Sequence, residues 1–107
     1  MGFGAKKHVI ELSGDVAPAG SETMDTFSLT GFIGYKYLVF MSGNGRTKFL
    51  ELNVAKENGG ASDSISSRLG DSLDVSINVT DDGADVSVTF ANSEAFTVSV
   101  KLLKFLL

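Results

Sequence analysis

The chain has 107 residues, a net charge of −4 and no cysteine. Its length is typical of one domain, and we expect residues 1–107 to form a single one. Without cysteine there is no disulfide framework, no thiolate metal site and no thiol nucleophile. The acidic balance argues against general binding to nucleic acid or to an anionic membrane surface, because that attraction requires surplus lysine and arginine.

The first residues carry no recognisable targeting signal. Two lysines, at positions 6 and 7, are not followed by an apolar stretch of signal-peptide length. No apolar run approaches the ~20 residues of a membrane-spanning helix. We therefore expect synthesis in the cytoplasm and no membrane insertion. Residues 1–7 are a candidate docking arm that becomes ordered only on binding.

The first half of the chain predicts several short strands. Residues 7–12 and 27–32 are candidate strands, and the polar segment 14–25 between them is predicted to be a loop. Residues 34–42 are apolar on both faces, which is typical of a strand covered on both sides, either by its own chain or by a partner. A glycine turn leads into a strand at 48–56. A second loop at 58–63 and a short strand at 65–67 follow.

The second half alternates between apolar and polar residues with a period of two. This pattern predicts half-buried antiparallel strands, and residues 73–102 are interpreted as a three-stranded meander. Its first connection, Asp81-Asp82-Gly83, has the composition of a hairpin turn. No helix of ordinary length is visible. The sequence therefore predicts an all-β fold, an antiparallel β-sandwich of jelly-roll-like type with seven to eight short strands.

Near the carboxyl end the alternation changes phase. Leu102 continues the apolar face of its strand, whereas Leu103, Phe105 and Leu107 fall on the face that was polar before. Either a β-bulge or a cover within the chain restores one core, or another chain covers the second apolar face. Under the second interpretation the protein is a homo-oligomer. Its candidate interface residues are Leu103, Phe105, Leu106, Leu107 and Phe3.

The titratable residues form no pattern typical of catalysis or metal binding. His8 is the only histidine, too few for a zinc site, and no nucleophile motif accompanies it. The spacing of Asp81, Asp82 and Asp85 departs from that of a calcium loop and favours a turn. We therefore expect no catalytic residues, no cofactor and no metal, and the protein is predicted not to be an enzyme.

Two other segments have a chemical and a structural interpretation. Residues 43–48 contain glycines and a lysine, but their spacing departs from a phosphate loop and favours a hairpin turn. Glu51 lies in an otherwise apolar strand. A catalytic role requires a second carboxylate, for which Asp74 and Glu94 are candidates, and an outward-facing charge is the simpler expectation. Exposed aromatic residues at Phe49 or Tyr35 would suit a sugar.

The order of strands and turns from Tyr35 onward resembles a known domain. About two thirds of the chain, residues 35–107, is similar to the small β-sandwich domain in structural proteins of tailed bacteriophages and gene transfer agents. In that family a central strand carries an aliphatic-Glu-aliphatic step, which Glu51 matches. The resemblance rests on these segments: Tyr35-Lys36-Tyr37-Leu38-Val39-Phe40, Phe49-Leu50-Glu51-Leu52-Asn53-Val54, Gly70-x-x-Leu73, Asp82-Gly83-Ala84-Asp85-Val86-Ser87-Val88 and Thr97-Val98-Ser99-Val100-Lys101-Leu102-Leu103.

This resemblance implies a structural function. It suggests a subunit of a phage-like particle, such as a head spike or fibre base, a decoration protein or a tail appendage. Such a subunit would sit at the virion surface, bind capsid or tail proteins and other copies of itself, and catalyse nothing. The alternative is a carbohydrate-binding adhesion module that attaches a particle or a cell to surface glycans.

Overall fold

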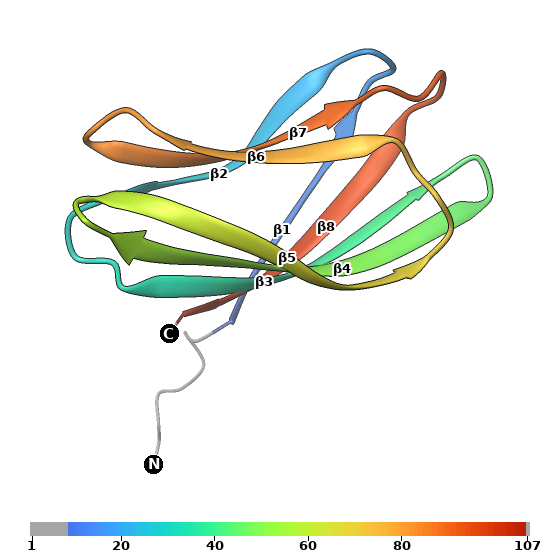
Figure 1. Ribbon diagram of the computed structural model, residues 1–107. Coiled ribbons are helices and arrows are strands. Elements are labelled where there is room, and N and C mark those ends of the chain that lie inside the picture. The colour runs from blue at the N-terminus through green and yellow to red at the C-terminus, as the bar shows by residue number, and fades with distance from the viewer. Residues whose placement is uncertain (1–8, 107) are drawn as a thin grey trace.

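The computed structural model describes residues 9–106 and consists of eight strands in two packed sheets (Figure 1). The predicted all-β sandwich of seven to eight strands is confirmed. Residues 9–106 contain no helix long and apolar enough to cross a membrane. The strands are β1 (Val9–Val16), β2 (Ser21–Ser28), β3 (Gly34–Gly43), β4 (Arg46–Glu57), β5 (Gly60–Gly70), β6 (Val75–Asp81), β7 (Asp85–Asn92) and β8 (Val98–Leu106).

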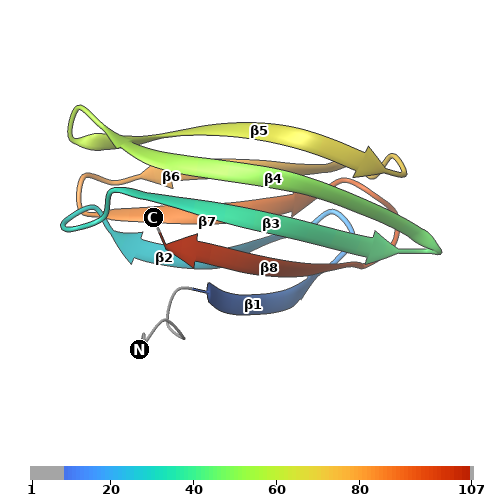
Figure 2. The ribbon, with the colours of Figure 1, turned by 90° about the horizontal axis from the view of Figure 1, so that it is seen from below.

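The two sheets differ in size. Sheet A has five strands in the order β1-β8-β3-β4-β5, and sheet B has three in the order β2-β7-β6 (Figure 2). All pairings are antiparallel. β1 pairs with β8 in sheet A and β2 pairs with β7 in sheet B, whereas β3-β4-β5 and β6-β7 are hairpins, so the two sheets share the ends of the chain but do not follow the full jelly-roll order. β3 is the central strand of sheet A, as its two apolar faces suggested.

Two Asn-Gly turns fix the register of the β3-β4-β5 hairpins. Asn44 and Gly45 have positive φ angles of 51° and 76°, and Asn58 and Gly59 have 49° and 80°. Positive φ at both central residues is the requirement of a type I′ turn, which matches the twist of the strands it joins. The hairpin predicted at residues 43–48 is confirmed. The predicted loop at 58–63 was too long, because strand β5 already begins at residue 60.

The predicted meander over residues 73–102 is wrong in its last strand. β6 and β7 form the expected hairpin, but β8 leaves sheet B and inserts between β1 and β3 of sheet A. The buried side chain of Asn92 holds this crossover: its Nδ2 donates to the carbonyl oxygens of Val16 at 3.0 Å and Phe96 at 2.8 Å. The alternation of apolar and polar residues indicates which face of a strand is buried, but it does not indicate which other strand pairs with it.

The predictions for residues 14–32 were also wrong. β1 continues to Val16, only residues 17–20 form the turn, and β2 covers residues 21–28. The pairing of β2 with β7 shifts register between Thr23 and Asp25, so the alternation along β2 changes phase. This irregularity gives β2 a loop-like pattern. Leu29 and Phe32, which the strand prediction included, are core residues of the β2–β3 connection.

The hydrophobic core fills the space between the two sheets. Its largest fully buried side chains are Tyr37, Phe90, Met41, Leu52 and Leu102, which come from both sheets. β8 keeps one uninterrupted alternation, and neither of its pairings contains a register shift. The explanation of the phase change by a β-bulge is therefore wrong.

The change of phase in the sequence pattern arises because a charged residue occupies one of the inward-facing positions of β8. After Val98, Val100 and Leu102, the next inward position of β8 is Lys104, which is 6% exposed. Leu103 and Phe105 point to the opposite face of sheet A, away from sheet B, because successive side chains of a strand alternate between faces. Sheet A therefore has apolar residues on both faces.

Candidate interaction surface on sheet A

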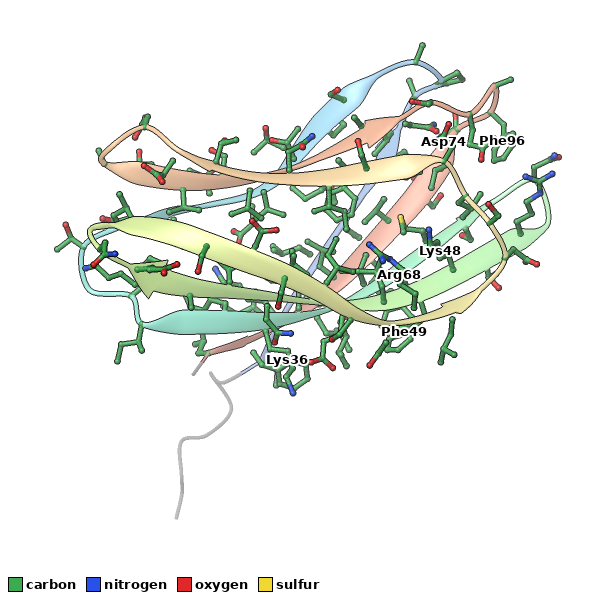
Figure 3. All side chains as sticks on the ribbon, in the orientation of Figure 1. Lys36, Lys48, Phe49, Arg68, Asp74 and Phe96 are labelled. Carbon is green, nitrogen blue, oxygen red and sulfur yellow. The ribbon has the colours of Figure 1, made fainter. Side chains whose placement is uncertain are left out.

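The outer face of sheet A, which faces away from sheet B, carries a group of apolar side chains from four strands. Leu38 of β3 lies opposite Leu103 of β8, and Phe49 of β4 lies opposite both Phe40 of β3 and Leu69 of β5. Together with Phe105 these side chains form what we call the outer patch: Leu38, Phe40, Phe49, Leu69, Leu103 and Phe105. In Figure 3, Lys36 and Phe49 project from this side of the sheet.

Two phenylalanines are at the centre of the outer patch. The ring centroids of Phe40 and Phe49 are 5.0 Å apart, with the rings tilted by 43°. Phe40 remains 40% exposed and Leu69 remains 65% exposed. An exposed cluster of this kind is unusual on a monomeric soluble protein and is typical of an interaction site.

A groove of about 940 Å³ crosses the same face near the β3–β4 turn. Phe40, Phe49 and Leu103 are among its apolar lining residues, and Leu69 lines it from edge strand β5. Its polar lining consists of hydroxyl side chains, acidic residues of the opposite edge strand β1, and two lysines: Ser13, Ser42, Thr47, Ser99, Glu11, Asp15, Lys48 and Lys101. The groove therefore combines apolar and aromatic residues with hydroxyl and charged groups.

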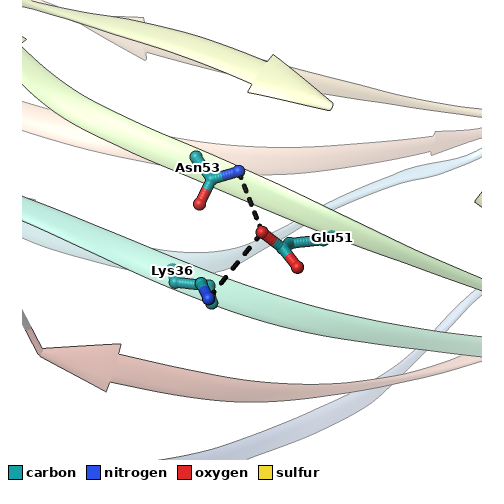
Figure 4. A network of polar contacts seen from close by, with 3 residues as sticks. All are labelled: Lys36, Glu51 and Asn53. Atoms are coloured by element: carbon teal, nitrogen blue, oxygen red, sulfur yellow. Dashed lines mark hydrogen bonds and ion pairs between the residues drawn. The ribbon is translucent and has the colours of Figure 1, made fainter. Parts of the chain in front are cut away.

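Two ion pairs flank the outer patch. Lys36 Nζ lies 3.9 Å from Glu51 Oε2, which also accepts a hydrogen bond from Asn53 Nδ2 at 3.3 Å (Figure 4). Lys101 Nζ lies 3.9 Å from Glu11 Oε2 at the other side of the sheet. The expectation of an outward-facing Glu51 is confirmed. Such exposed pairs add little stability, and they lower the charge that a partner would meet.

The outer face of sheet B has a different character. Its side chains on β7 and β6 are mainly hydroxyls and amides, including Ser87, Thr89, Asn78 and Thr80. Thr89 also forms a hydrogen bond of 3.0 Å with Thr23 of β2 through their hydroxyl groups. A polar face of this kind is satisfied by water. The contrast identifies the outer face of sheet A as the candidate interaction surface.

The sequence-predicted interface residues separate into three groups. Leu103 and Phe105 lie in the outer patch, whereas Leu106 is half-buried on the inward side of β8, like Lys104. Phe3 and Leu107 lie outside the described residues, as does the docking arm at 1–7. Leu69 was not foreseen, because the pattern around it did not predict a long strand in this region.

A buried polar cluster, which no pattern in the sequence indicates, lies between the sheets. Lys104 Nζ is 2.8 Å from Asp25 Oδ2, and the Tyr37 hydroxyl donates to the same oxygen at 2.7 Å. The ammonium also lies 4.1 Å from the ring centroid of Tyr35 and 4.9 Å from that of Phe27. These rings and the carboxylate stabilise the charged lysine in place of water.

The Tyr37 hydroxyl is strongly affected by this environment. Burial, the hydrogen bond to Asp25 and the negative charge of that carboxylate all raise the pKa of Tyr37 far above its usual range. The phenol therefore stays protonated and acts as a hydrogen-bond donor. Since all the polar groups of this cluster are engaged with one another inside the fold, we interpret it as a structural link between the sheets.

The other candidate groups have structural partners. Asp82 Oδ1 accepts hydrogen bonds from the backbone N–H groups of Ala84 and Asp85 at 2.9 and 2.7 Å, which confirms the predicted hairpin turn. These bonds lower the pKa of Asp82. Glu94 Oε2 accepts a hydrogen bond from the backbone N–H of Asp74.

Within residues 9–106 no three histidine, cysteine, aspartate or glutamate side chains are grouped as metal ligands. His8 lies outside the described residues. Comparison with known proteins adds no assignment, since no family model and no curated protein matches the sequence.

Proposed function

We propose that this chain is a structural subunit of a phage-like particle, of the head spike or fibre base, decoration or tail-appendage type. In this proposal it works by binding other proteins and catalyses no reaction. The observation that carries it is the outer patch, an apolar surface on a sheet whose other face is already buried in the core. The resemblance of residues 35–107 to particle domains gives the class of assembly.

The shape of the surface supports binding to protein. Burying apolar side chains on a sheet face requires a partner surface of matching width, and a second sheet or a flat domain face provides one. Large aromatic residues near the centre of a surface, such as Phe40 and Phe49, are typical anchors of protein interfaces. We therefore expect the outer patch to be covered in the assembled particle.

Particle composition tests this proposal. Particles are purified from the organism that carries the gene, and the chain is detected in them by mass spectrometry. We expect it to co-purify with capsid or tail proteins. Leu103→Lys places a charge in the outer patch and should strongly reduce incorporation, whereas Asn78→Lys adds the same charge to sheet B and should not. Absence of the wild-type chain from purified particles would contradict the proposal.

The groove favours one second candidate function, binding of a surface glycan. Sugars stack on exposed aromatic rings through their C–H faces and form hydrogen bonds with short polar side chains. The Phe40–Phe49 pair and nearby Ser42, Thr47 and Ser99 provide both kinds of group. A glycan array followed by calorimetry tests this function. Binding that Phe49→Ala abolishes would support it, and no binding to any polysaccharide would contradict it.

A further inference from the structure

We propose that the outer patch binds a second copy of this chain, so that two molecules pack sheet A against sheet A about a two-fold axis. This inference rests on the proposed function, because it names the partner for the same surface. Four observations carry it: the size of the face, its charge, the presence of an exposed leucine at the margin of a groove, and the polar character of the opposite side of the molecule.

The size of sheet A matches a stable two-fold interface. It has five strands, of which the shortest, β1, has eight residues. With strands ~4.8 Å apart and a rise of ~3.4 Å per residue, the face measures roughly 24 by 27 Å, or about 650 Å² in projection. A standard interface buries ~800 Å² of accessible surface on each partner, and accessible area exceeds projected area.

The charge of the face permits contact between identical molecules. The whole chain carries −4, and the outer face of sheet A places two lysines among four carboxylates. These six residues are Lys36, Lys101, Glu11, Asp15, Glu51 and Glu57. Lys36 and Lys101 are paired with Glu51 and Glu11, and the other two carboxylates lie at the margin of the face, Asp15 on edge strand β1 and Glu57 at the end of β4, so two copies meet with little repulsion at its centre.

The face carries a strongly exposed leucine at the margin of the groove. Leu69, 65% exposed on edge strand β5, lines the groove that Phe40, Phe49 and Leu103 also line. About a two-fold axis, a contact from one copy to the other is repeated in reverse. Leu69 of each molecule can therefore enter the groove of the other, where its side chain is buried against Phe40 and Phe49.

The same symmetry limits the assembly to two molecules. A self-complementary patch is fully buried once it has bound one other copy. A ring, in contrast, requires two different patches on each subunit. In residues 9–106, the other outer sheet face is polar, and it offers no second surface of this kind. The expected product is a closed dimer with four sheet layers, in which the two A sheets lie ~10 Å apart.

Light scattering and sedimentation of the purified full chain, over a range of micromolar concentrations, test this inference. We expect the wild-type protein to have twice the mass of the chain. Phe40→Lys should weaken the dimer by about tenfold or more, since it places a charge at the centre of the interface. Asn78→Lys is the control of equal charge and should leave the dimer intact. Circular dichroism checks that each variant is folded.

A second pair of variants avoids any change of charge. Leu69→Ala should weaken the dimer, whereas Ile33→Ala should not, although Ile33 is even more exposed, at 77%. A wild-type monomer at every concentration, a ring of higher order, or a dimer unaffected by Phe40→Lys and Leu69→Ala would overturn the inference. A dimer that dissociates when a glycan or a particle protein is added would still support it.

The particle experiment separates this inference from the proposed function. A monomeric chain that is incorporated into particles would refute only the dimer and would assign the outer patch to a different particle protein. A dimer that never enters particles would support the dimer and refute the particle function.

Discussion

Lys104 of β8 and Asp25 of β2 connect the two sheets through a buried ion pair, with 2.8 Å between Nζ and Oδ2. Both side chains are nearly inaccessible, at 8% and 12% exposure. The pair occupies a position at which the alternation of β8 would otherwise place an apolar side chain. Its cost of desolvation is offset by the hydroxyl of Tyr37 and by the ring faces of Tyr35 and Phe27.

Removal of one member of this pair should be more harmful than removal of both. Asp25→Ala leaves a buried ammonium without its carboxylate and should lower the free energy of unfolding by about 3–5 kcal/mol. The double variant Asp25→Leu with Lys104→Met replaces the pair by apolar groups and should recover most of this loss. Urea unfolding monitored by circular dichroism measures both. Equal destabilisation by the single and double variants would contradict the assignment.

The hydroxyl of Tyr37 should make stability depend on pH in the alkaline range. Tyr37→Phe should cost about 1.5–3 kcal/mol at neutral pH, because a buried hydrogen bond to the charged carboxylate of Asp25 is lost. In the unfolded chain the phenol ionises near pH ~10, whereas its raised pKa in the folded state keeps it protonated. The stabilisation is therefore complete below about pH 10 and declines as the pH rises further.

Unfolding free energies of wild type and Tyr37→Phe, measured between about pH 8 and about pH 11, test this dependence. The advantage of the wild type should shrink at the upper end of the range. A constant difference between the two proteins would show that the folded state does not favour the neutral phenol.

Replacing the amide of Asn92 by a carboxylate of the same shape should strongly lower the stability of the fold. Its Nδ2 donates to three backbone carbonyl oxygens, of Val16, Ala17 and Phe96, and the side chain is buried. Asn92→Asp removes these donors and faces the carbonyl groups with an acceptor, so we expect a loss of about 3 kcal/mol in thermal or urea unfolding. Asn78→Asp, the same change at an exposed position, should stay within about 0.5 kcal/mol.

Two glycines with similar backbone angles should respond differently to alanine. Gly70 and Gly83 have φ of +99° and +91°, so each alanine is strained. A Cβ at Gly70 would also lie 2.5 Å from the carbonyl oxygen of Thr47, whereas Gly83 faces open space. Gly83→Ala should cost about 1–2 kcal/mol and Gly70→Ala clearly more. Equal melting temperatures for the two variants would show that the β4–β5 contact yields to the added methyl group.

The strand content of the fold was predictable because the alternation of apolar residues is strong in β6, β7 and β8. The arrangement of these strands was not, because the crossover of β8 depends on hydrogen bonds of Asn92 to residues far away in the sequence. The phase shift in β2 could not be predicted for a similar reason, since it also depends on pairing with a distant strand. Its irregular pairing with β7 places Met24 and Asp25 together on the half-buried side.

The candidate surface was predictable in part. Leu103 and Phe105 were noticed because they are apolar residues on a strand face that is otherwise polar. They stay on that face because the alternation of β8 continues without a break and places Lys104 inward. The sequence contains no sign that Lys104 is buried, because its partners Asp25 and Tyr37 lie on other strands. The groove depends on the pairing of five strands, and sequence alone does not bring these together.

The position of β8 also constrains how the chain folds during synthesis. β8 is an interior strand of sheet A and separates β1 from β3, so β1 has no neighbour in that sheet until residues 98–106 have left the ribosome. The β3-β4-β5 hairpins can form early, since their contacts are local. Strand β1 can therefore join sheet A only after strand β8 has been synthesised. We therefore expect nascent chains stalled before residue 98 to remain sensitive to protease and to be ready targets for chaperones.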